Sequence, residues 1–123
     1  MRVCVYCRVG NAEQLDGWAM KAQCSRVKRF AEDKGWQIVK EVCEYGVGTT
    51  MNRPGLREAA ELARAGQVDL MLIQDLSRLS RRRQGADDFL NLLHQHNVTL
   101  FSITEGLALP PHKELNIALI ASL

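Results

Sequence analysis

Arginine side chains follow three separate apolar stretches of this chain, and arginine is suited to one kind of chemistry. Arg8 follows residues 2–6, Arg53 comes after residues 37–43, and residues 68–73 are followed by a dense basic cluster. That cluster consists of Arg78, Arg81, Arg82 and Arg83. A guanidinium group stays charged and binds two oxygens of a phosphate at once. If the three positions meet in the fold, they predict a binding site for a phosphate or a phosphodiester. Alternatively, Arg82 and Arg83 lie in solvent at the start of a helix and bind nothing.

The elements that must position these arginines are predicted by the hydropathy pattern. The predicted strands are residues 2–6, 37–43, 68–73 and 98–103, and the predicted helices are residues 18–34, 56–65 and 85–96. Gly35 and Gly66 stand just after the first two helices, in the position that favours glycine. Strands that alternate with helices are typical of an α/β domain, with a mostly parallel central sheet and flanking helices in three layers.

The loops that follow parallel strands lie at one edge of the sheet, where binding sites gather. The loops 7–14, 44–53 and 74–83 are therefore expected to converge. This convergence would bring Arg8 and Arg53 close to the basic cluster.

The composition indicates one ordinary domain. The chain has 123 residues, of which 46% are hydrophobic, and a formal net charge of +2. This apolar fraction supports one core and excludes a disordered chain, and no apolar run approaches the ~20 residues of a membrane span. The chain turns polar too early for a signal peptide, so a cytoplasmic protein with no membrane partner is expected.

The four cysteines, at positions 4, 7, 24 and 43, include a CxxC pair. That pair lies in a predicted strand, where residues three apart point to opposite faces of the sheet. No second close pair follows, and the three histidines (His94, His96 and His112) are far away in sequence. Buried reduced thiols are therefore expected, with no metal and no cofactor; a zinc or redox centre is the alternative.

Two other phosphate-binding classes fit the sequence poorly. A phosphoacceptor signalling domain would use Asp75 after the third strand, but it also needs acids after the first strand for Mg²⁺, where Arg8 stands. A dinucleotide-binding domain needs a three-glycine fingerprint after the first strand. The segment Gly46-Val47-Gly48 supplies only two of these three glycines, and it follows the second predicted strand rather than the first.

Four motifs together make the sequence resemble the catalytic domain of the serine recombinases, the resolvase/invertase family. The first is YCRVGNAEQ at residues 6–14, and the second is GTTMNRPGL at residues 48–56. The third is LSRLSR at residues 76–81, and the fourth is Thr104-Glu105. The motifs occur in the family's order and spacing over almost the whole chain, so the set is specific although each motif alone is weak.

The resemblance implies site-specific cleavage and rejoining of DNA, with DNA bound through its phosphate backbone. In this family a serine hydroxyl attacks a phosphodiester, arginines stabilise the transition state, and no metal or nucleotide is used. Dimers and tetramers, formed through a long C-terminal helix, exchange strands by subunit rotation. The family's site positions correspond here to Arg8, Gly10 (nucleophile position), Gln14, Arg53, Ser77 (acid position), Arg78 and Arg81.

This chain departs from the family pattern at four positions. Gly10 replaces the nucleophilic serine, Ser77 replaces the acid, Val47 replaces a loop serine and Glu114 stands where an arginine is usual. Glycine has no hydroxyl, so covalent catalysis at that position is excluded. We therefore expect a catalytically degenerate recombinase domain that keeps an arginine-lined phosphate site.

Three alternatives to simple degeneracy would also account for these departures. In the first, Cys7 or Ser77 is a relocated nucleophile, although the sequence offers neither of them a nearby histidine or carboxylate base. In the second, position 10 carries an engineered Ser→Gly change. In the third, the chain is a non-catalytic partner subunit or oligomerisation module of a recombinase.

The domain organisation follows from the same resemblance. Residues 1–105 are expected to form the resolvase-like domain, and residues 106–123 a linker and the truncated start of the long interface helix. An apolar helix face formed by Leu115, Leu119, Ile120 and Leu123 is still running where the chain stops. A longer parent protein, and a homo- or hetero-oligomer that covers this face, are therefore expected.

Overall fold

A computed structural model describes residues 1–10, 17–46, 53–79 and 86–109. The strands are β1 (Arg2–Val9), β2 (Gln37–Tyr45), β3 (Leu70–Ile73), β4 (Thr99–Ser102) and β5 (Leu107–Leu109), and the helices are α1 (Trp18–Asp33), α2 (Pro54–Arg64), the 3₁₀ turn η1 (Leu76–Arg78) and α3 (Ala86–Gln95). Expectations for Gln14, Val47, Arg81, Arg82, Arg83, Glu114 and the C-terminal helix lie outside the described residues.

The strands form one sheet in the order β2-β1-β3-β4-β5. The pairs β1–β2, β1–β3 and β3–β4 are parallel, and β4–β5 is antiparallel. The predicted α/β class with a mostly parallel sheet is thus confirmed. β5 was not predicted, and it extends the sheet beyond residue 105 into the segment that was expected to be a linker.

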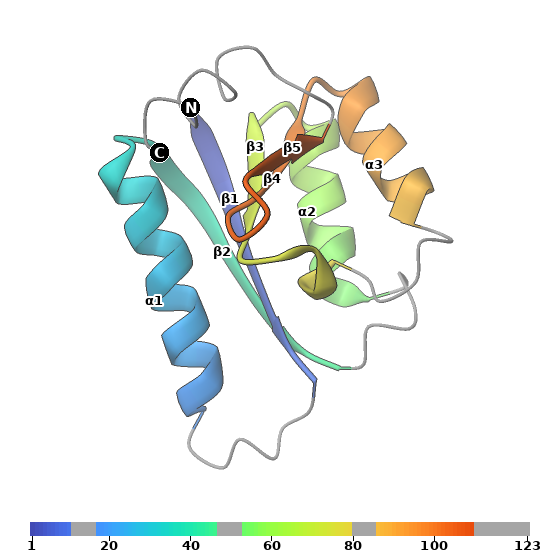
Figure 1. Ribbon diagram of the computed structural model, residues 1–123. Coiled ribbons are helices and arrows are strands. Elements are labelled where there is room, and N and C mark those ends of the chain that lie inside the picture. The colour runs from blue at the N-terminus through green and yellow to red at the C-terminus, as the bar shows by residue number, and fades with distance from the viewer. Residues whose placement is uncertain (11–16, 47–52, 80–85, 110–123) are drawn as a thin grey trace.

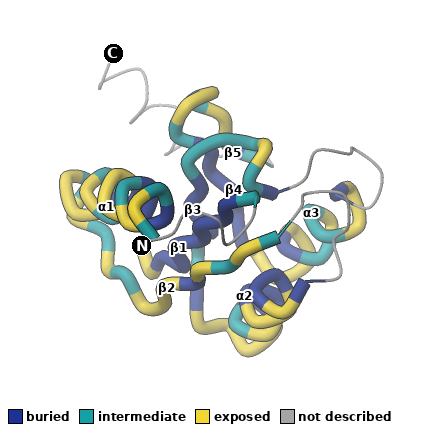
Figure 2. Tube along the Cα trace, turned by 90° about the horizontal axis from the view of Figure 1, so that it is seen from below, coloured by how far each residue is buried: buried dark blue, intermediate teal, exposed yellow. Residues whose placement is uncertain are grey.

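Helices cover both faces of the sheet, with α1 on one side and α2 and α3 on the other (Figures 1 and 2). The alternating side chains of β1 supply both cores. Cys4 and Tyr6 join the apolar cluster beneath α2 and α3, while Val3, Val5 and Cys7 join the cluster beneath α1. β1 is therefore buried on both faces, as expected for a central parallel strand.

The ends of the helices follow the predicted signals. Gly35 and Gly66 adopt left-handed backbone angles, with φ of 73° and 68°, directly after the C-caps of α1 and α2. α2 begins at Pro54, two residues earlier than predicted, because proline fits the first turn of a helix. In the described part of the chain, no helix is long and apolar enough to cross a membrane.

The starts of β1 and β3 are joined by an ion pair at the surface. Asp69 Oδ2 accepts from the backbone N–H of Arg2 at 2.8 Å, and Oδ1 accepts from Arg2 Nη2 at 3.0 Å. Arg2 Nη1 also donates to the Gly66 carbonyl at 2.8 Å. The hydrogen bonds from Arg2 hold the pKa of Asp69 below its ordinary value.

We predict that Asp69→Asn lowers the free energy of unfolding at pH 7 by less than about 1 kcal/mol, because the pair is largely exposed. Since the pKa of Asp69 is lowered on folding, its stabilisation is complete above the unfolded value of about 3.9 and disappears as the pH falls through the folded value. Urea unfolding of both proteins between pH 7 and pH 3 should show the difference shrinking below about pH 4. A difference that stays constant over this range would contradict the prediction.

Candidate functional site

The buried guanidinium of Arg8 joins the ends of three strands. Arg8 lies near the end of β1 and is only 2% exposed. Its Nη1 donates to the Gly46 carbonyl after β2 at 2.5 Å, and its Nε donates to the Arg78 carbonyl after β3 at 2.8 Å. Its Nη2 donates to the carbonyl of Ser77. The expected meeting of the first, second and third strand ends is therefore present in the described part of the site.

The backbone of Arg8 is held as firmly as its side chain. The Arg8 N–H donates to Gln23 Oε1 at 2.9 Å, and Gln23 Nε2 donates back to the Arg8 carbonyl at 3.0 Å. Arg78 Nη1 donates to the same carbonyl at 3.0 Å. The sequence analysis did not identify Gln23. A polar amide among the apolar residues of α1 that face the sheet was the sequence signal that could have indicated its role.

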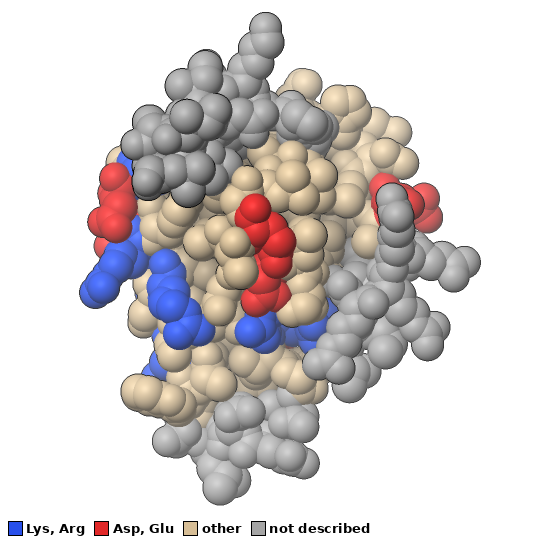
Figure 3. Space-filling model, in the orientation of Figure 1, with Lys and Arg blue, Asp and Glu red and all other residues tan. Residues whose placement is uncertain are grey.

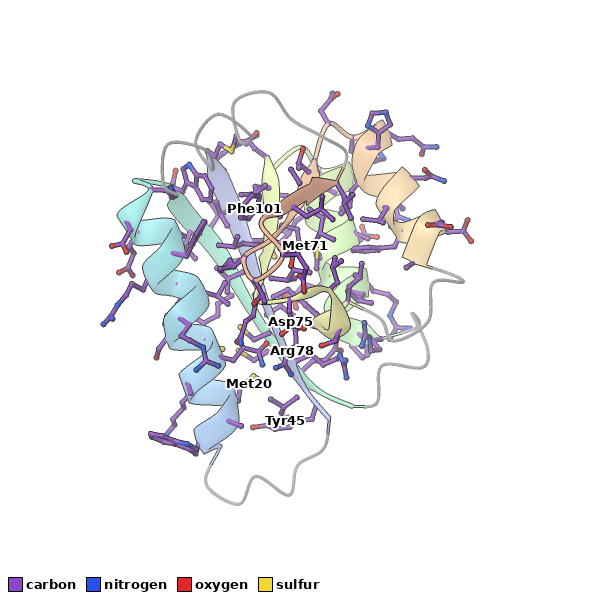
Figure 4. All side chains as sticks on the ribbon, viewed as in Figure 1. Met20, Tyr45, Met71, Asp75, Arg78 and Phe101 are labelled. Carbon is purple, nitrogen blue, oxygen red and sulfur yellow. The ribbon has the colours of Figure 1, made fainter. Side chains whose placement is uncertain are left out.

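A carboxylate accompanies Arg78, although position 77 holds a serine. Asp75 caps η1 by accepting from the backbone N–H of Ser77 at 3.0 Å, and its Oδ2 lies 3.3 Å from Arg78 Nε. The hydroxyl of Ser77 donates to Asp75 Oδ1. The expectation that Ser77 has no carboxylate nearby was therefore wrong, because the 3₁₀ turn brings together residues two apart. Figure 4 shows Asp75 and Arg78 side by side below the sheet centre.

Arg53 occupies the other side of this edge, between β2 and η1. It is 5% exposed, its Nη2 donates to the Leu79 carbonyl, and its Nε lies 3.8 Å from Glu44 Oε2. Its guanidinium carbon lies 5.9 Å from the ring centre of Tyr6. Arg53 Nε and Nη1 are buried and make no hydrogen bond in the structure as described. Such donors are costly to leave unpaired, so this guanidinium retains capacity for an acceptor.

Glu44, which sequence reasoning missed, organises the residues around Arg53. It accepts from the hydroxyl of Tyr6 and, at 2.9 Å, from the backbone N–H of Gly55 at the start of α2. Burial, together with the hydrogen bond to Glu44, raises the pKa of Tyr6 above its ordinary value. Tyr6 therefore stays neutral and serves as a donor to Glu44 rather than as a nucleophile.

Two glycines at this edge have opposite surroundings. A Cβ atom added to Gly55 would lie 2.8 Å from both Glu44 Oε2 and Val42 Cγ1, so α2 can approach β2 only with glycine there. A Cβ atom added to Gly10, directly after β1, would meet no atom of the described residues within 4 Å. Gly10 is also absent from the glycines with a positive φ. Packing therefore demands the glycine at 55, whereas the space at position 10 would admit a serine.

Charges of both signs share this face of the molecule. In the space-filling view, basic side chains gather in the lower half and an acidic stripe lies directly above them (Figure 3). Glu105, in the turn before β5, contacts the start of η1: it accepts from the backbone N–H of Leu76 at 3.1 Å, and also from the hydroxyl of Ser102. The described part of the site is thus a charge-balanced network rather than an open basic patch.

A family model described as "Resolvase, N terminal domain" matches residues 3–123, which is almost the whole chain. The chain belongs to this family. The resemblance carried by the four sequence motifs is thereby confirmed.

Solved serine recombinases share the fold of this resolvase-family chain. A resolvase family site-specific recombinase from Streptococcus pneumoniae is 26% identical, with a TM-score of 0.77 over 99% of this chain and 85% of the other. The N-terminal catalytic domain of TP901-1 integrase is 23% identical, with a TM-score of 0.76 over 98% of this chain and 92% of the other. The C-terminal catalytic domain of the ISC1926 TnpA recombinase is 24% identical, with a TM-score of 0.76 over 84% and 70%. The chain thus has the fold of a serine recombinase catalytic domain.

We predict that Arg8→Lys lowers the free energy of unfolding by about 2–4 kcal/mol, because one ammonium group cannot reach three carbonyls that diverge around a planar fork. Urea unfolding measures the loss. Arg64→Lys is the matched control, since Arg64 is exposed and pairs only with Glu61 among the contacts described; its effect should stay within about 0.5 kcal/mol. Equal effects of the two substitutions would refute the structural role of Arg8.

Proposed function

We propose that this resolvase-family domain binds the DNA phosphate backbone at the edge formed by Arg53 and Arg78, without forming a covalent link through position 10. The observation that carries the proposal is the convergence of Arg8, Arg53 and Arg78 at one edge of the sheet. Gly10 directly follows β1 and takes the position that the family motif gives to the nucleophilic serine. Loss of a covalent nucleophile costs on the order of 10⁶ in rate in well-studied hydrolases, so this domain is catalytically degenerate.

The phosphate-binding role falls on particular arginines. The side chain of Arg8 donates to three backbone carbonyls, so its role is to position the loops after β2 and β3. The side chain of Arg78 is 27% exposed and is the one a phosphate can reach directly, whereas Arg53 is buried, with two nitrogens that make no hydrogen bond among the described residues. Phosphate oxygens are the acceptors that such groups bind best. Arg81 and Gln14 belong to the proposed site through the family motifs alone.

A second candidate function is that of a non-catalytic partner subunit in a recombinase assembly. The observation in its favour is that Arg8, Arg53 and Arg78 all donate to backbone carbonyls of the domain itself. Arginines used in this way stabilise the fold whether or not DNA is present. This candidate predicts a hetero-oligomer and no DNA affinity.

The covalent step is tested with supercoiled or nicked recombination-site DNA, using denaturing gels to detect protein linked to DNA. We predict that the wild-type chain gives no adduct, because Gly10 has no hydroxyl. A Ser77→Ala variant is tested in parallel, since the Ser77 hydroxyl donates to Asp75. An adduct from the wild type that disappears in Ser77→Ala would overturn the proposal and assign the nucleophile to Ser77.

Non-covalent DNA binding is tested by fluorescence anisotropy at several salt concentrations. We predict that Arg78→Gln weakens binding and lowers the slope of log K against log salt by about 0.9, the value for one lost phosphate contact. Arg64→Gln is the control, because Arg64 is exposed at the far end of α2, which begins beside the site at Pro54. Thermal melting verifies that both variants are folded. Identical salt slopes for all three proteins would refute the phosphate site at Arg78, and the absence of binding by the wild type would favour the partner-subunit role.

A further inference from the structure

Three of the four cysteines face one another between α1 and the sheet, away from the arginine site. The Sγ atoms of Cys7, Cys24 and Cys43 all lie within 4.8 Å of one another. Those of Cys24 and Cys43 are 3.1 Å apart. Cys7 and Cys24 are buried, whereas Cys43 is exposed, which corrects the expectation that all four thiols are buried.

The fold brings these thiols together by strand register and helix packing. Cys7 on β1 and Cys43 on β2 are direct partners in the parallel pair, so their side chains share a face of the sheet. α1 packs on that face and contributes Cys24 to the apolar cluster that includes Cys7. Cys4 lies in the cluster on the other face, as the strand pattern predicted. The CxxC pair therefore does not act as a unit, and the cluster consists of residues distant in sequence.

We propose that Cys7, Cys24 and Cys43 form a binding site for a thiophilic d¹⁰ cation, with Zn²⁺ as the ion that fits best. Thiolates are the ligands that select zinc and monovalent copper over harder ions. Two thiolates on one tetrahedral zinc lie ~3.8 Å apart, since each Zn–S bond is about 2.3 Å. The sulfur atoms are already near this spacing, so small side-chain rotations suffice to bind the ion.

A fourth ligand is available in Glu41. It lies two residues before Cys43 on β2, hence on the same face, and its Oε1 is 3.7 Å from Cys43 Sγ. Its Oε2 accepts from Lys28 Nζ on α1 at 3.2 Å. A lysine that orients a ligating carboxylate is a typical outer partner in metal sites. The three thiolates leave one tetrahedral position of Zn²⁺ open, which water takes or which Glu41 takes after a side-chain rotation.

A surface hollow gives the ion a path to the cysteines. It has a volume of about 300 Å³ and is lined by Met20, Cys24, Glu41 and Cys43, together with Lys21, Ser25 and Lys28. Figure 4 shows Met20 near the lower end of α1 on the side that faces β1. The Met20 thioether is a further soft donor, of the kind that suits monovalent copper.

A cation that binds these thiols must displace their protons, so its affinity is expected to increase with pH.

The test uses Co²⁺ as a spectroscopic substitute for Zn²⁺ in the intact 123-residue chain, purified under reducing conditions. We expect one Co²⁺ per chain, with thiolate-to-cobalt charge-transfer absorption and tetrahedral d–d bands that disappear when Zn²⁺ is added. Cys24→Ala should weaken binding by more than about 100-fold. Cys4→Ala is the matched control because it removes a buried thiol from the other face of β1, and it should bind as the wild type does.

Cys43→Ala provides a second ligand variant at an exposed position, and thermal melting verifies that it is folded. Parallel titrations with monovalent copper under anaerobic conditions show which d¹⁰ ion the site prefers. Wild-type protein that binds Co²⁺, Zn²⁺ and monovalent copper no better than the Cys24→Ala variant overturns the proposal. A Cys24–Cys43 disulfide that, once reduced, leaves a protein unable to bind these metals also overturns it. None of these measurements requires DNA, so their outcome is independent of the proposed recombinase-type function.

Discussion

The positive charge of Arg8, buried at the end of the central strand, is the constraint on which the rest of the site depends. A buried guanidinium is tolerated only when its hydrogen bonds are made, and here the acceptors are carbonyls of Gly46, Ser77 and Arg78. Two of these carbonyls follow β3 and one follows β2. The cation therefore fixes the relative positions of two loops that share no direct strand pairing, and the site at this edge is built around it.

This use of Arg8 determines what its neighbours are free to do. The carboxylates of Glu44 and Asp75 lie against Arg53 and Arg78, which lowers the positive charge that the edge presents to a phosphate. The positive charge of this edge is therefore smaller than a count of arginines suggests, in line with a net charge of only +2 for the chain. The spacing of the three arginines did not show that Arg8 is buried among backbone carbonyls while Arg78 is partly exposed.

Sequence patterns predicted what depends on local periodicity, and they missed what depends on register. The helices, the four main strands and the glycines after α1 and α2 were predicted because each has a signal within a few residues. The parallel-sheet rule then placed the three arginine loops together. Glu44, Gln23 and the three-cysteine cluster were missed because their partners lie on other strands or helices, and a one-residue shift in register would turn each of them away. β5 was missed because three residues carry too little pattern.

The two glycines at this edge differ in what the fold requires of them. Gly55 is required, since any side chain there would collide with Val42 and Glu44. Gly10 has open space among the described residues, so a hydroxyl would fit there without a clash. Among the described contacts of Arg8, the side chain holds the strand ends through backbone carbonyls, and none of these hydrogen bonds involves position 10. Selection for stability alone would therefore preserve the arginine and remain indifferent to the nucleophile, so the shared architecture of this family is no evidence that a given member cleaves DNA.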